Sequence, residues 1–169
     1  MGLFAGLVKI VVDSASGTIY VDNKEIENKM EEFVLHYTQI LQKAYDYDSK
    51  GEIVVAVVMT GIFAAKSDGK FLKKEGFELV DLMVESLGEE NISREEAYET
   101  VMELSKAPVD MEDLGRIAIN LKRKYGRGAI EMLRSIIEFI IYVDGEVSQK
   151  EKDFLESWEK TIKILEMHS

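Results

Sequence analysis

Apolar residues recur at three- and four-residue steps through most of the chain, the spacing that places them on one face of an α-helix. Between Asn23 and Tyr45, for example, Ile26, Met30 and Phe33 follow this rhythm, and Asn23 is a candidate N-cap. The pattern predicts seven or eight helices, covering residues 23–45, 52–67, 73–87, 93–106, 111–125, 129–143 and 148 onward.

Two of these segments, 52–67 and 129–143, are apolar on almost every side and are predicted to be buried. The valines of the first segment would also suit a buried strand. Its length, after an expected chain break at Gly51, and its resemblance to the second segment favour a helix. Without a convincing sheet, we predict an all-α fold: a single domain over 23–169.

Residues 1–22 form a separate N-terminal apolar segment, which opens MGLFAGLVKIVV. It lacks the small-residue cleavage site that follows the apolar core of a signal peptide. Docking of this segment on the domain as a helix is one interpretation, and docking on a membrane or a partner is the other.

The chain contains an internal duplication of a helical hairpin, with units at about 52–88 and 128–165. Each unit has an apolar helix, an Asp-Gly pair that can end it, and a Glu seven residues after the Asp. A constant offset of 76 residues superimposes the motif residues Asp68, Gly69 and Glu75 on Asp144, Gly145 and Glu151.

The four motif acids are candidate metal ligands. If the two copies pack about a pseudo-twofold axis, their carboxylates converge and need a cation or protons, because like charges about 4 Å apart repel by about 4 kcal/mol at an effective dielectric near 20. Carboxylate oxygens without cysteine favour calcium, magnesium or manganese, and zinc also accepts them. The alternative is turn architecture, in which Ser148 and Glu151 form only a capping box.

Composition narrows the function classes. The chain has no cysteine, which excludes disulfides and thiolate metal sites and fits a cytoplasmic protein. Its net charge of −11 disfavours nucleic acid and anionic lipid and favours cations and basic partners. The longest apolar run, 53–65, is too short to cross a bilayer. With two histidines and no nucleophile motif, we expect no enzyme activity.

A second acidic segment, DYDSKGEI at 46–53, begins like a calcium-binding loop. It has Val57 where a bidentate glutamate is required, so a polar connection between helices is the preferred interpretation.

The motifs GIFAAKSDGKFLKKE and IIYVDGEVSQKEKDFL resemble the paired acidic motifs of the TerB-like tellurite-resistance family, an all-helical fold that is also similar to the N-terminal domain of DjlA-type co-chaperones. The resemblance covers about residues 52–165. It implies a cytoplasmic, non-enzymatic domain that binds a divalent metal through Asp68, Glu75, Asp144 and Glu151. It further implies work with membrane-associated protein partners, peripheral to the inner membrane, in stress response and tellurite resistance. A metal-independent, co-chaperone-like interaction module is the alternative hypothesis.

Overall fold

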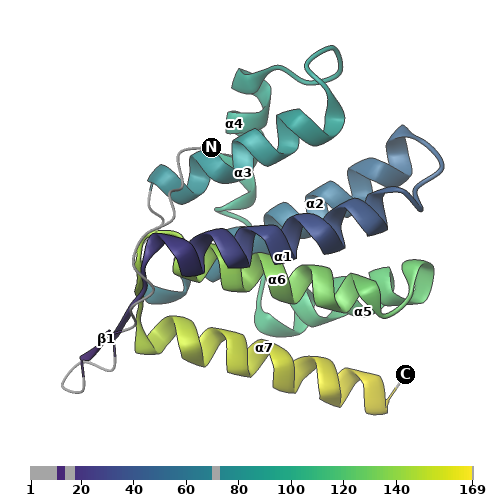
Figure 1. The fold of residues 1–169 in the computed structure, drawn as a ribbon. Helices are drawn as coiled ribbons and strands as arrows, with labels where there is room; N and C mark the ends of the chain where they lie inside the picture. The colour runs from purple at the N-terminus through teal and green to yellow at the C-terminus, as the bar shows by residue number, and fades with distance from the viewer. Residues whose placement is uncertain (1–10, 14–17, 70–72, 169) are drawn as a thin grey trace.

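Helices dominate the described part of the chain, as the apolar spacing predicts. The computed structural model describes residues 11–13, 18–69 and 73–168 (Figure 1). The seven α-helices found there are α1 (Asn23–Leu41), α2 (Tyr47–Ala65), α3 (Lys73–Leu87), α4 (Arg94–Leu104), α5 (Met111–Tyr125), α6 (Gly128–Tyr142) and α7 (Gln149–Met167), and a 3₁₀ turn, η1 (Lys66–Asp68), extends α2. The predicted all-α fold is confirmed.

Helix α6 lies at the centre of the core. Ten of its fifteen residues are buried, and it packs against α1, α2, α5 and α7. Helix α2, the other nearly all-apolar segment, also has ten buried residues. Figure 1 shows α3 and α4 above α1 and α2, with α7 on the opposite side beyond α5 and α6. None of the described helices combines the length and the apolar character needed to cross a bilayer.

The prediction that the chain has no sheet is wrong in one place. Strands β1 (Val11–Asp13), β2 (Thr18–Tyr20) and β3 (Glu146–Val147) form a small antiparallel sheet in the order β1-β2-β3. The N-terminal segment is therefore not a docked helix over 11–13 and 18–20; residues 1–10 lie outside the described part. Strands of two or three residues are too short to show an alternating pattern, which explains why the sequence did not predict them.

Two helix starts also differ from the prediction. Asp22, rather than Asn23, caps α1 by accepting a hydrogen bond from the Glu25 N–H at 3.0 Å. Gly51 does not break the chain, because Asp46 caps α2 five residues before it, with its carboxylate 2.8 Å from the Ser49 N–H. This cap also accounts for the acidic segment that resembled the start of a calcium-binding loop.

Two helical glycines provide a test of the packing. A methyl group at Gly51 would meet nothing within 4 Å, whereas one at Gly115 would come within 2.7 Å of Leu165 and 2.8 Å of Thr161. We expect Gly51→Ala to raise the free energy of unfolding by about 0.5–1 kcal/mol, through the gain in helix propensity. Gly115→Ala should lower it by about 1 kcal/mol, because α7 must move away from α5.

Urea unfolding of both variants, followed by the emission of Trp158, measures the two changes. If both variants change the free energy of unfolding by the same amount and with the same sign, the result contradicts the close approach of α5 and α7.

Candidate functional site

The two Asp-Gly turns have the same backbone geometry. Gly69 and Gly145 take positive φ angles of 86° and 84°, a region that favours glycine. The Gly69 N–H donates to the Lys66 carbonyl at 2.9 Å, and the Gly145 N–H donates to the Tyr142 carbonyl at 2.9 Å. These acceptors are themselves 76 residues apart, so the duplication seen in the sequence extends to the hydrogen bonds that end each helix.

The small sheet holds the second turn in place. Strand β3 pairs with β2 immediately after the turn, with Ile19 opposite Val147. The Val21 N–H donates to the Gly145 carbonyl at 2.8 Å. Val147 is buried, as expected of a residue that anchors the turn to the core. Phe71, which the offset of 76 residues pairs with Val147, lies outside the described residues. The N-terminal hairpin therefore fixes the position of Asp144.

The structure brings three of the four predicted acids together. Asp68 at the end of η1, Asp144 after α6, and Glu151 in the first turn of α7 line one cavity of about 380 Å³. Helix α7 packs against η1, which places the second hairpin beside the first turn. The remaining lining residues are Thr18, Glu146, Ser148, Gln149 and Lys150.

Of the three predicted acids in the cavity, Glu151 has the pKa that is raised most. Its side chain caps α7: its Oε1 accepts a hydrogen bond from the Ser148 N–H at 2.9 Å, and the Ser148 hydroxyl accepts one from the Glu151 N–H at 3.2 Å. Only 2% of the residue is exposed. Burial raises the pKa of Glu151 to about 7, and repulsion from Asp144 and Asp68 acts in the same direction, against the two cap hydrogen bonds.

The pKa of Asp144 is raised for the same reasons as that of Glu151, but to a smaller extent. Burial raises its pKa, and the charges of Glu146 and Asp68 add to the effect. Its Oδ1 accepts a hydrogen bond from the Glu146 N–H at 3.1 Å, as in an Asx turn. In Asp144, as in Glu151, one carboxylate oxygen accepts a hydrogen bond from a backbone N–H of its own turn.

Glu75, the fourth predicted acid, matches Glu151 in burial, with 2% exposed, and lies in the first turn of α3. It is not among the described residues that line the cavity. Three of the four predicted acids therefore line one cavity, and the convergence of the four on a common point stays a prediction.

The cavity has the chemistry of a site for a hard cation, although its side chains are not arranged around one. Asp68, Asp144 and Glu151 supply carboxylate oxygens, and a cation would relieve the repulsion that raises two of their pKa values. Within residues 11–13, 18–69 and 73–168, no three acid or histidine side chains already form a metal-binding group. Binding would thus require the carboxylates to turn inward from their present positions.

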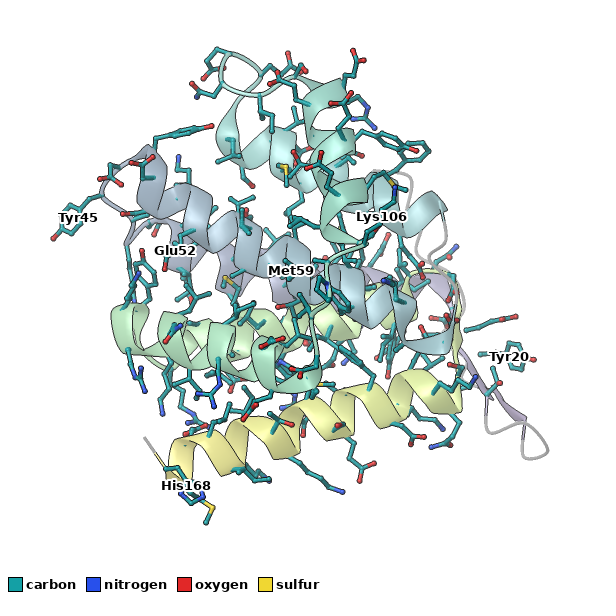
Figure 2. All side chains as sticks on the ribbon, turned by 180° about the vertical axis from the view of Figure 1, so that it is seen from behind. Tyr20, Tyr45, Glu52, Met59, Lys106 and His168 are labelled. Carbon is teal, nitrogen blue, oxygen red and sulfur yellow. The ribbon has the colours of Figure 1, made fainter. Side chains whose placement is uncertain are left out.

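Sequence reasoning missed part of the lining. Thr18 comes from the N-terminal hairpin, and only the pairing of β2 with β3 brings it to the cavity. Lys150, at the start of α7, is exposed and adds a positive charge to the rim. Figure 2 shows His168 at the far end of the molecule from Tyr20, which belongs to the same hairpin as Thr18, so this histidine is remote from the cavity.

No protein-family model, curated protein or solved structure matches the chain. The resemblance to the TerB-like family therefore stays a prediction, and the geometry of the cavity is the remaining guide to function.

The raised pKa of Glu151 predicts a specific pH dependence of stability. Since the folded state holds this proton more tightly than the unfolded state, the stabilisation is full below about pH 4.5 and is lost as the pH rises through about 7. Glu151→Gln keeps a side chain that can cap the helix but cannot ionise. In EDTA, we expect the variant to match the wild type at pH 5 and to be more stable by about 2–3 kcal/mol at pH 8.5.

Urea unfolding at the two pH values, again followed by Trp158, measures this difference. The free energies of unfolding of the wild type and of the variant could instead differ by the same amount at pH 5 and at pH 8.5. That result would show that Glu151 is not protonated in the folded protein near neutral pH.

Proposed function

We propose that this chain is a non-enzymatic, TerB-like helical domain that binds a divalent cation between its two Asp-Gly turns. In this proposal it acts as an adaptor or sensor in stress and tellurite resistance, together with a protein partner. The observation that carries the cation-binding part is the convergence of Asp68, Asp144 and Glu151 on one cavity. The role in tellurite resistance depends on the resemblance of the motifs alone.

Electrostatics support a cation as the ligand. Three carboxylates share the cavity. The pKa values of Asp144 and Glu151 are raised chiefly by burial, and the charges of neighbouring carboxylates, Asp68 among them, act in the same direction. Near neutral pH, a bound proton relieves only part of this repulsion. A divalent ion would neutralise more charge and would hold η1 against the start of α7, so that the cation stabilises the contact between the two hairpins.

Calcium, magnesium and manganese fit this oxygen-rich cavity best. Each accepts carboxylates, and each fills its remaining coordination positions with water or backbone carbonyls. Zinc binds carboxylates as well, but it more often takes histidine or cysteine ligands. An open site with three side-chain ligands predicts weak affinity and exchange with the surrounding solution.

A second candidate function is a metal-independent protein-interaction module of the co-chaperone type. The observation in its favour is that Asp144 and Glu151 already have hydrogen-bond partners within their own turns. In this case the acidic turns shape the fold, and the net charge of −11 attracts a basic partner. The response of the protein to cations separates the two candidates.

Thermal unfolding with and without cations tests the proposal. At pH 7.5, about 1 mM of a cation that binds with a Kd near 0.1 mM would stabilise the folded state by about 1.4 kcal/mol. For a chain of this length, this corresponds to a rise in Tm of about 3–6 °C. We expect such a rise for at least one of calcium, magnesium, manganese and zinc, and its loss in Asp68→Asn/Asp144→Asn.

Glu99→Gln/Glu103→Gln provides the matched control, because it removes two negative charges from exposed positions on α4. This variant should keep the full cation response. If the wild type shows no rise in Tm with any of the four cations, the metal-independent module is the better description.

A further inference from the structure

A groove runs between α1 and α3, separate from the acidic cavity. Its volume is about 320 Å³, and its floor is formed by Leu79 of α3 with Ile136 and Ile140 of α6. Met30 and Val34 form the apolar wall on α1, and Leu82 forms the wall on α3. Val34 is 48% exposed although it lies beside this apolar surface. The groove therefore offers solvent-accessible apolar contact.

The rims of the groove are acidic on both sides. Glu78 and Glu85 lie along the α3 rim, one on each side of Leu82 in the sequence. On α1, Glu27 and Glu31 each precede a wall residue, Met30 or Val34, by three positions, so they lie on the same side of the helix. Asp81 also lines the groove, but it pairs with Arg94, and Glu78 likewise has an interaction within the protein, so Glu85 carries the charge of the α3 rim. An apolar floor between two rows of carboxylates is complementary to a ligand with an apolar stripe and basic flanks.

The length of the groove matches two turns of a helix. Its lining on α3 runs from Glu78 to Glu85, about 10 Å along the helix axis. A helical ligand reaches over this distance with apolar residues at positions i, i+4 and i+7. Beyond Glu85 and Val34, the hydroxyl groups of Tyr37 and Ser86 form a 2.5 Å hydrogen bond that joins α1 to α3. This bond closes one end of the groove.

We propose that the groove between α1 and α3 binds a basic amphipathic helix of a partner protein. Leucine-type side chains of the ligand fill the space above Leu79 and Ile140. Lysine or arginine side chains on either side of that stripe pair with Glu85 on α3 and with Glu27 and Glu31 on α1. Charge complementarity decides the occupant: a chain with a net charge of −11 and carboxylates along both rims repels acidic helices and attracts basic ones.

Fluorescence polarisation with designed peptides tests this proposal in EDTA, so that its outcome is independent of cation binding. The probe is a labelled 15-residue peptide with leucines on one helical face and lysines elsewhere. One comparison peptide has the same composition in scrambled order, and a second has glutamate in place of lysine. We expect saturable binding of the probe, and binding at least tenfold weaker for both comparison peptides.

Variants of the protein locate the binding site. Val34→Arg places a positive charge and a long side chain at the groove, and we expect it to weaken binding of the probe at least tenfold. Val55→Arg is the matched control, because Val55 is 42% exposed on α2 and does not line the groove. Glu78→Gln/Glu85→Gln should weaken binding threefold or more and reduce its salt dependence, whereas Glu99→Gln/Glu103→Gln should have a smaller effect.

Three results would overturn the proposal. Equal binding of the scrambled peptide would show attraction by net charge alone. Equal effects of Val34→Arg and Val55→Arg, in variants that both keep the wild-type Tm, would place the peptide elsewhere. A tenfold gain in affinity after deletion of residues 1–10 would show that the chain's own apolar segment, and not a partner, occupies the groove.

Discussion

At the start of α7, the hydrogen bonds that cap the helix hold the carboxylate of Glu151 in a position where its negative charge is unfavourable. Glu151 must remain close to the Ser148 N–H to cap the helix, and this position buries its carboxylate beside Asp144 and Asp68. Capping by an ionised carboxylate is favourable at a helix N-terminus, whereas burial near two other acids is not. Because the pKa of Glu151 is raised to about 7, this carboxyl holds a proton in about half of the molecules at neutral pH, which relieves part of the repulsion.

The surrounding structure keeps these acids together in spite of their repulsion. The left-handed conformations of Gly69 and Gly145 end the preceding helices at defined points, and the pairing of β2 with β3 holds the second turn against the body of the protein. Helix α7 is then fixed by buried Trp158 and Ile162. Apolar burial of this kind contributes about 1.5–3 kcal/mol for each large side chain, enough to offset the electrostatic cost of the turns.

The sequence predicts most of this architecture, because the helical period is clear over most of the helices and the duplication marks both turns. It does not decide between adjacent candidates such as Asp22 and Asn23, since either residue can cap a helix. It also misplaces the start of α2, because a glycine within a helix costs only about 1 kcal/mol and the cap at Asp46 outweighs it. Motif spacing identified Asp68, Asp144 and Glu151, but Thr18 reaches the cavity only through strands too short to show a period. The groove could not be predicted at all, because it depends on the distance between α1 and α3.

Helix α3 forms one wall of the groove and carries the buried acid of the first motif at its start. Its first turn carries Glu75, the buried acid of the first motif, and its next two turns carry Leu82 and the glutamates of the groove rim. A helix of fifteen residues behaves as a rod, so the position of its first turn determines where the rim lies relative to α1. The Tyr37–Ser86 hydrogen bond holds the other end of that rod. This pair of hydroxyl groups therefore helps to set the distance between α1 and α3 at that end of the groove.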